Sequence, residues 1–230
     1  MPTPRRPAPA AKRPGMPKPP RVRRGNLEDQ ASLRAQVVGV AFDIFRRQGM
    51  QALTMRAVAA EVGVSAMALY RYFAGKGELL RGLWDFVLVE IRAELDAAEA
   101  PQPTAEGRAQ ARLEAFIHYW ESHPDHYRLV YATPQTLESG ESPWTATPLY
   151  LELLETGLQR LQELATAIGG DPRHARMARD MQHCLVQGYL YSRIVNERYP
   201  WADLDAMRAE VIVSVMQAVK RCLKGGASAA

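Results

Sequence analysis

Tyr70, Arg71 and Tyr72 stand side by side, and each can hydrogen-bond to nucleic acid. An arginine can bind guanine through two parallel hydrogen bonds, whereas a tyrosine hydroxyl can donate to a phosphate oxygen. The preceding segment is small and weakly polar, and it adds the candidate contacts Ser65, Ala66, Met67 and Ala68. Ala66 and Met67 can offer only apolar contact, for instance to a thymine methyl group. Because an isolated helix of this length is unstable in water, neighbouring elements must hold it.

The elements around this segment have the order of a helix-turn-helix. Apolar residues recur at helical spacing from Leu33 to Phe45, and Gly49 is expected to end that helix. Thr54 is a suitable N-cap for a second, short helix, and Gly63 supplies a turn after it. Ser65 then caps a helix expected over 66–72. In this motif, the N-terminal residues of the second helix enter the major groove of DNA.

The stretch AFDIFRRQGMQALTMRAVAAEVGVSAMALYRYFAGKGELL (Ala41–Leu80) resembles the DNA-binding domain of the tetracycline-repressor (TetR-like) transcriptional regulators. The matching features are Ala41, Phe45, Gly49, Leu53-Thr54, Val58-Ala59, Val62-Gly63-Val64-Ser65, Leu69-Tyr70, Tyr72-Phe73, Lys76 and Leu79-Leu80. The resemblance implies that Thr54, Tyr70 and Lys76 hold the DNA backbone. Tyr72 departs from the family, which often has histidine there; it can still donate to phosphate, or it can close the small core with Phe73.

The remaining chain is predicted to be helical throughout, which makes the fold all-α. The expected elements are helices over 77–97, 105–122, 148–168, 172–198 and 203–222, a short helix from Pro124, and a loop over 133–147. The predicted organisation is a disordered basic, proline-rich arm (1–25), a three-helix helix-turn-helix DNA-binding domain (26–76) and a larger C-terminal bundle (77–230). The resemblance implies that this bundle binds a small molecule and forms a dimer.

The positive charge of the chain is concentrated in the N-terminal arm. The net charge is +4, but residues 1–25 carry eight Lys and Arg and no acid, so the other residues sum to 4 − 8 = −4. Such an arm can enter the minor groove, or it can raise non-specific affinity by displacing counterions from phosphates. A solubilising tail is the third possibility. We favour phosphate affinity, since the spacing of the prolines suits reach rather than fixed geometry.

Aromatic and polar residues in the C-terminal half are candidates for a ligand pocket. The five that combine an apolar body with a polar neighbour or handle in a helix are Phe116, Trp120, Tyr127, His183 and Gln187. Many such residues simply fill a core, so each has a structural alternative. Pocket composition favours an apolar or aromatic effector, whose identity the sequence does not give.

The last two helices are expected to form a homodimer. Gly188 and Ser192 allow close approach on one of them, and Ile212, Val213 and Met216 widen the apolar stripe of the other beyond one face. A twofold dimer would present two recognition helices to a palindromic operator. The resemblance implies a repressor released by its effector, although an activator has the same sequence pattern. An entirely intramolecular bundle is the alternative.

Other classes of function receive little support from the sequence. The histidines His118, His123 and His126 lack the spacing of a helical metal site, and Cys184 and Cys222 stand alone, so no metal, disulfide or cofactor is expected. No nucleophile, zinc-helix or complete phosphate-loop motif indicates an enzyme, so no catalytic residue is predicted. The chain lacks a secretory signal and a run of apolar residues that could span a membrane, which favours the cytoplasm. The main alternative is an architectural, weakly sequence-specific DNA-binding protein.

Overall fold

The computed structural model describes residues 27–132, 147–196 and 198–226, and every regular element in these ranges is helical. The predicted basic arm lies outside the described residues, as does the predicted loop except for Thr147. The α-helices are α1 (Leu27–Gln48), α2 (Met55–Val62), α3 (Ala66–Leu69), α4 (Lys76–Glu99), α5 (Ala105–Ser122), α6 (Pro124–Tyr127), α7 (Pro148–Ala167), α8 (Ala175–Ile194) and α9 (Leu204–Leu223). A π-helical turn (Arg128–Ala132) follows α6, and a 3₁₀ turn (Pro172–His174) precedes α8.

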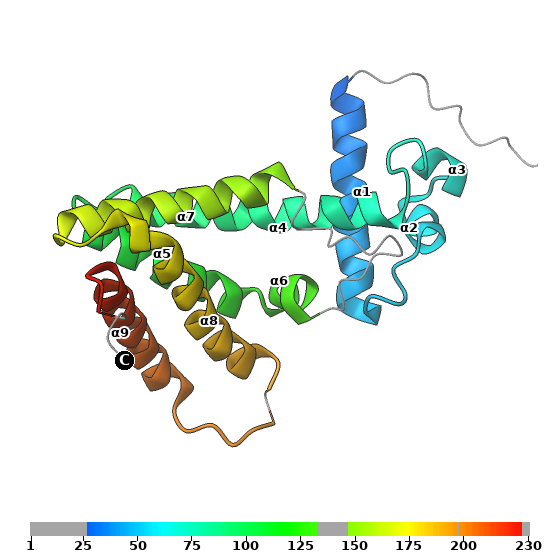
Figure 1. The fold of residues 1–230 in the computed structure, drawn as a ribbon. Coiled ribbons are helices and arrows are strands. Elements are labelled where there is room, and N and C mark those ends of the chain that lie inside the picture. The colour runs from blue at the N-terminus through cyan, green and yellow to red at the C-terminus, as the bar shows by residue number, and fades with distance from the viewer. Residues whose placement is uncertain (1–26, 133–146, 197, 227–230) are drawn as a thin grey trace, which may run out of the picture.

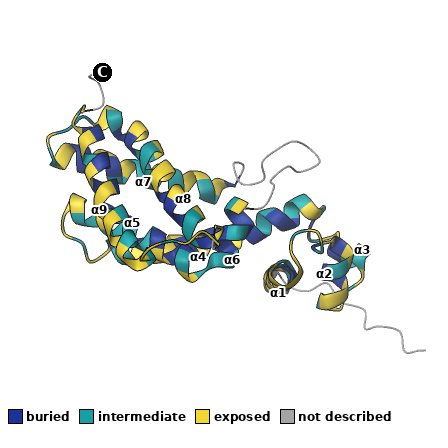
Figure 2. Cartoon of the chain, turned by 90° about the horizontal axis from the view of Figure 1, so that it is seen from below, coloured by how far each residue is buried: buried dark blue, intermediate teal, exposed yellow. Residues whose placement is uncertain are grey.

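The helices form two lobes that α4 joins (Figure 1). The smaller lobe consists of α1, α2, α3 and the first turns of α4, and the larger lobe contains the rest of α4 and the helices that follow. In the view from below, the smaller lobe stands apart from the bundle, and buried residues line the inner faces of both (Figure 2). Helix α4 therefore contributes residues to both lobes.

A small core holds the short helices that cannot be stable alone. Leu53, Val58, Leu69 and Phe73 are each almost fully buried beneath α1 and α4. Gly82 lets α4 approach this core closely, because a Cβ atom there would lie 3.2 Å from Val38 and 3.3 Å from Phe73. The burial of Phe73 agrees with its predicted structural role.

Helix boundaries agree with the sequence where a cap or a glycine marks them. The first helix ends at Gln48 and is followed by Gly49, whose φ of 80° suits glycine. The Oγ1 atom of Thr54 caps α2 by accepting from the amide of Ala57 at 3.1 Å. Thr104 caps α5 in the same way, and α5 has the predicted bounds.

Two helix predictions were wrong. The predicted helix over 172–198 is a 3₁₀ turn and then α8, which ends at Ile194. The carboxylate of Asp171 accepts from the amide of Arg173, which favours the tight initial turn. The predicted helix over 66–72 is α-helical only to Leu69, after which the chain tightens.

Candidate DNA-binding surface and ligand cavity

The segment that carries Tyr70 and Arg71 is a single α-helical turn that continues as tighter turns. Ser65 starts it, because its Oγ atom accepts from the amide of Ala68 at 3.0 Å. The amides of Arg71 and Tyr72 then bond to carbonyls three residues earlier, to Ala68 at 3.2 Å and to Leu69 at 2.9 Å. These i to i+3 bonds are of the 3₁₀ type. The segment therefore keeps a helical course to Tyr72 although its α-helix is short.

Burial separates the predicted DNA contacts into exposed and packed residues. Met67 is 81% exposed, Tyr70 is 53% exposed, and Ser65 and Arg71 are exposed beside them. By contrast, Ala66 and Tyr72 are partly buried and pack against the core. The structure thus presents Met67, Tyr70 and Arg71 to solvent, while Tyr72 takes the packing role that its departure from the family pattern left open.

Two further predicted contacts, Thr54 and Lys76, lie at the starts of α2 and α4. Both are exposed, and the ammonium group of Lys76 donates to the carbonyl of Met50 at 3.2 Å. Neither α2 nor α3 has an acidic residue in its first turn, so their N-terminal amides keep a favourable field for phosphate. Arg56, which the sequence analysis did not select, is exposed in the first turn of α2. Its position two residues after the Thr54 cap was the available signal.

Arg34 of α1 fixes the backbone that follows the exposed segment. Its guanidinium group donates to the carbonyl of Tyr72 and lies 4.3 Å from the ring centroid of Phe73. The same group pairs with Glu78 at 3.2 Å, and Glu78 accepts from the amide of Ala74 at 2.6 Å. These bonds lower the pKa of Glu78, with the Ala74 amide as the largest cause and Arg34 as a further one. The exposed segment is consequently anchored at its C-terminal side as well as at its cap.

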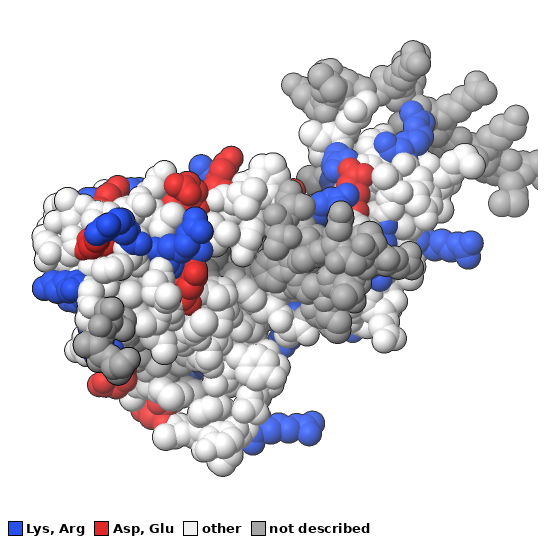
Figure 3. Space-filling model, in the orientation of Figure 1, with Lys and Arg blue, Asp and Glu red and all other residues white. Residues whose placement is uncertain are grey.

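Cationic side chains lie on the surface of both lobes. On the face shown in Figure 3, Lys and Arg side chains project from the smaller lobe beside acidic side chains, and both signs also mix over the larger lobe. Cations that project in this way suit a polyanion such as DNA.

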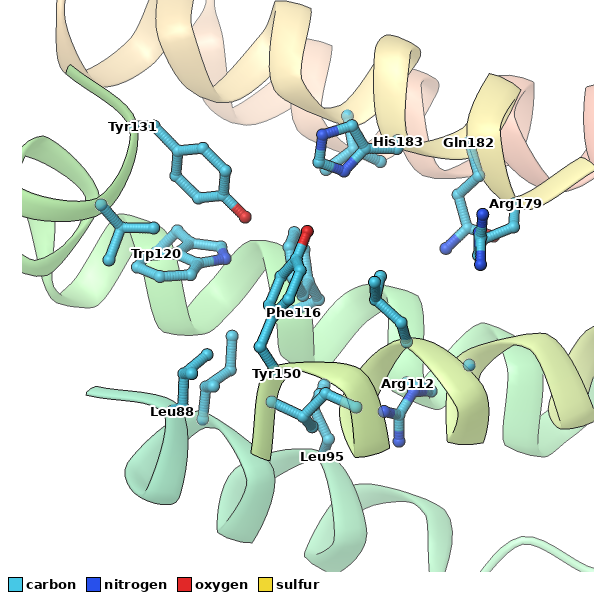
Figure 4. A pocket seen from close by; sticks show the side chains of 16 residues that line it. Leu88, Leu95, Arg112, Phe116, Trp120, Tyr131, Tyr150, Arg179, Gln182 and His183 are labelled. Atoms are coloured by element: carbon cyan, nitrogen blue, oxygen red, sulfur yellow. The ribbon is translucent and has the colours of Figure 1, made fainter. Parts of the chain in front are cut away.

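The larger lobe contains a cavity of about 150 Å³ among α4, α5, α7 and α8 (Figure 4). Three of the five predicted pocket residues line it: Phe116, Trp120 and His183. Tyr127 and Gln187 are not in its wall, and they bond to each other, the Tyr127 hydroxyl donating to Oε1 of Gln187 at 2.8 Å. Burial raises the pKa of Tyr127 to about 12, with a smaller contribution from Tyr191, so this pair stays neutral.

The charged and polar part of the wall, which consists of Arg112, Arg179 and Gln182, was not predicted from the sequence. The pocket candidates were chosen mainly among aromatic residues, and long cationic side chains were expected at the surface. A signal was present: Arg179, Gln182, His183 and Val186 follow i, i+3, i+4, i+7 spacing, and all four line the cavity.

Ion pairs tie the helices together next to the cavity. The carboxylate of Glu99, which is 4% exposed, accepts from Arg112 Nη1 and from Arg160 Nε, both at 2.5 Å. Arg160 also bonds to Glu163 at 2.9 Å. This network joins α4, α5 and α7.

His183 lies at the rim of the cavity. Desolvation lowers the pKa of its ring despite the opposing attraction of Asp180, so the ring is neutral at pH 7.

The three clustered histidines have ordinary structural contacts. His126 is buried with its Nδ1 atom 2.8 Å from the hydroxyl of Tyr119, and its ring stacks on His123 with centroids 5.0 Å apart. His118 is exposed. Within the part of the chain that the structure describes, no group of three or more His, Cys, Asp or Glu residues could hold a metal ion. None of the described helices combines the length and the apolar character needed to cross a membrane.

Comparison with known proteins agrees with the motif. The family model described as "Bacterial regulatory proteins, tetR family" matches residues 37–83. The HTH-type transcriptional repressor DrrR1 of Streptomyces coeruleorubidus is 41% identical over 80 residues, which cover 35% of this chain and 27% of that protein. The chain therefore spans about a quarter of the length of this relative.

Solved structures share the fold over most of the chain. A tetR-family bacterial regulatory protein from Rhodococcus RHA1 superposes with a TM-score of 0.59 at 17% identity, covering 81% of this chain and 96% of the other. A TetR variant from Acinetobacter baumannii, crystallised with minocycline, gives a TM-score of 0.56 at 20% identity, covering 80% and 93%. The family model shows that residues 37–83 are similar to the helix-turn-helix region of the tetR family, and the solved structures show the same helical fold over most of the chain.

Proposed function

We propose that this protein is a transcriptional regulator, not an enzyme, that binds DNA through the smaller lobe and a small molecule through the larger one. The observation that carries the proposal is that one helix serves both regions. Helix α4 starts at Lys76 beside the exposed turn, and its residues Leu88, Ile91 and Leu95 line the cavity. We assign residues 26–76 to DNA binding and 77–230 to ligand binding and dimerisation, with the protein acting in the cytoplasm.

Met67 and Arg71 would face base edges, and Thr54, Ser65, Tyr70 and Lys76 would hold phosphates. The exposure of Met67 and Arg71 supports this division, because only a side chain free of the core can reach into a groove. The hydroxyls of Thr54 and Ser65 accept from amides and so keep a proton that can be donated to phosphate. Ala66 and Tyr72 would act through packing, with Tyr72 contributing at most its hydroxyl.

Ligand binding would alter the position of α4 and α6 relative to α1. His126 of α6 packs edge-on against Phe42 of α1, with ring centroids 4.8 Å apart, and lies 6.0 Å from Phe86 of α4. Val130 and Tyr131, which belong to the π-helical turn after α6, line the cavity. A ligand that prefers one arrangement of these contacts would shift the spacing of two recognition segments and release DNA. Repression relieved by the ligand is the form that we propose.

A homodimer through α8 and α9 would supply the second recognition segment. Met177 and Leu185 of α8 and Val213 of α9 are 64%, 44% and 50% exposed, and Gly188 of α8 is exposed as well. An apolar face of this kind supports burial against a second copy. The predicted use of Met216 at this face was wrong, because it is 6% exposed within the core, and Ile212 is partly buried.

The experiment that tests the proposal is selection of bound duplexes from a random pool, using the full-length protein at about physiological salt. We expect a palindrome with half-sites about one helical turn apart, since two symmetric recognition segments would enter successive major grooves. If no sequence is enriched and binding vanishes at modest salt, sequence-specific regulation is wrong and the architectural alternative gains support.

Two substitutions then separate base recognition from phosphate contact. Arg71→Ala should relax preference at one base position by about 1–3 kcal/mol. Lys76→Ala should weaken all duplexes alike and reduce the salt slope by about 1. If Arg71→Ala instead lowers the affinity for all duplexes equally, Arg71 contacts the DNA backbone and does not recognise a base. Removal of residues 1–24 should lower affinity but keep the selected preference, whereas an architectural protein would lose nearly all binding.

A further inference from the structure

The cavity in the larger lobe has the size of a small, single-ring molecule. Its volume is about 150 Å³, and its walls include Leu88, Ile91, Phe116 and Leu153. An engineered protein cavity of about this volume takes up benzene. The ligand body that fits this cavity is therefore one ring or a short branched chain.

A buried hydrogen-bond donor faces this space. Trp120 is 1% exposed, and its Nε1 atom has no hydrogen-bond partner in the described part of the protein. Figure 4 shows this nitrogen directed toward the middle of the cavity, on the same side as the hydroxyl of Tyr131. An indole N–H can only donate, and a buried donor without an acceptor is costly. The site thus calls for a ligand with an oxygen or nitrogen acceptor on its body.

The other end of the cavity carries positive charge. Arg179 and Gln182 lie there, away from Trp120 and Tyr131 (Figure 4). Arg112 and Arg179 line the cavity, and among its described lining residues there is no Asp or Glu. An adjoining hollow shares both arginines and adds Arg160, again without an acid in its described lining.

Of these arginines, Arg179 is the one that a ligand can engage. Arg112 and Arg160 are already held by the buried carboxylate of Glu99. Arg179 pairs at 2.8 Å with its chain neighbour Asp180, whose side chain is 58% exposed. A pair with so exposed a partner contributes little, so a ligand anion can replace it. A carboxylate also matches the planar donors of a guanidinium group.

We propose that the cavity binds a small amphipathic carboxylate. Its anionic head lies at Arg179 and Gln182. Its body is a ring or short chain with an oxygen that accepts a hydrogen bond from the indole N–H of Trp120. This specifies the effector more narrowly than an apolar or aromatic molecule. It rests on the proposed function only for the step from ligand binding to DNA release, since binding itself depends on the cavity alone.

The first test compares 3-(4-hydroxyphenyl)propionate with its primary amide by isothermal titration calorimetry on the full-length protein. The two probes have the same ring and nearly the same size, so they differ mainly in charge. We expect the carboxylate to bind about tenfold to a hundredfold more tightly, as a charge-assisted hydrogen bond allows. Arg179→Gln should remove most of this difference. The control Arg176→Gln, exposed on the same helix and outside the lining, should keep it.

The second test addresses the Trp120 donor. Wild-type protein should prefer 3-(4-hydroxyphenyl)propionate over 3-phenylpropionate, and Trp120→Phe should abolish that preference while binding of 3-phenylpropionate persists. Circular dichroism would verify that the variant is folded, and the Arg179→Gln comparison stands independently if it is not.

Three results would overturn the inference. They are equal affinity for the amide and the carboxylate, an undiminished preference for the carboxylate in Arg179→Gln, or no binding of either carboxylate.

Different results would contradict the proposed function. Carboxylate binding that leaves a selected duplex bound would refute the effector role but keep the ligand class. Failure to select any duplex would refute the regulator, whatever the calorimetry shows.

Discussion

The DNA-facing segment and the ligand cavity are built in opposite ways. Around α3, hydrogen bonds join residues three or four apart, such as Ser65 with Ala68 and Ala66 with Tyr70. Beside the cavity, bonds join residues far apart in the chain: Arg160 to Glu99 over 61 positions and Tyr127 to Gln187 over 60. The hydrogen bonds within the first region are thus mostly local, although Arg34 and the small core also hold it, whereas the bonds of the second region depend on how whole helices pack.

This contrast indicates where each region is vulnerable. A substitution at α3 should change DNA binding with a modest effect on stability, because few contacts outside the turn are lost. A substitution in the ties beside the cavity should mainly destabilise the bundle. The variants below test whether substitutions in the two regions affect stability and DNA binding in these different ways.

The largest effect is expected at Glu99. Glu99→Gln would leave Arg112 and Arg160 side by side without their shared carboxylate, which belongs to a side chain that is only 5% exposed. Removing one member of a buried ion pair costs about 3–5 kcal/mol. Urea unfolding of both proteins at neutral pH would measure this loss. The control is Glu163→Gln, whose side chain is 41% exposed and which should cost about 1 kcal/mol or less.

If Glu99→Gln is no more destabilising than Glu163→Gln, the network is not a principal tie of the bundle. The contrast between the regions would then rest on apolar packing alone.

A nearly equal effect is expected from pH, through His126 at the contact between the lobes. Burial and the neighbouring His123 lower the pKa of His126 to about 4, against opposition from Asp125, and Glu90 lies 3.7 Å from Nδ1. Above about pH 6.5 the ring is neutral in folded and unfolded chains alike. Between that pH and about 4 only the unfolded chain gains the proton, so the free energy of unfolding should fall by about 3 kcal/mol in total.

Unfolding free energies measured from pH 8 to 4.5 would test this. His126→Gln should reduce the slope of the unfolding free energy against pH, because glutamine cannot take up a proton. The reduction should correspond to at most one proton bound on unfolding. An unchanged slope in the variant would show that His126 takes up its proton in the folded protein as easily as in the unfolded one.

Sequence reasoning was most successful where structure is local. The caps at Thr54 and Ser65 and the stop at Gly49 involve neighbours three or four residues apart, so the residues themselves reveal them. The short α3 was overextended because its last turn keeps a helical course with i to i+3 bonds, and side-chain spacing does not distinguish the two.

The cavity was only partly predictable for the same physical reason. Phe116, Trp120 and His183 were chosen by type and line it, whereas Tyr127 and Gln187 have the same chemistry but bond to each other. Arg112 and Arg179 were missed because a charged residue is normally placed on the surface, and only the packing of α5, α7 and α8 brings them to one wall.

The smallest effect on stability is expected at Ser65, where folding and DNA binding use the same hydroxyl. Ser65→Ala removes the acceptor for the Ala68 amide and should cost about 1 kcal/mol of stability, together with some DNA affinity. Ser65→Asp should keep the cap and the stability, because aspartate is an equally good N-cap. Its charge would nevertheless repel phosphate, so duplex affinity should fall further than with alanine. If the aspartate variant binds a selected duplex as well as wild type, Ser65 is a cap alone, and function at this turn rests on Met67, Tyr70 and Arg71.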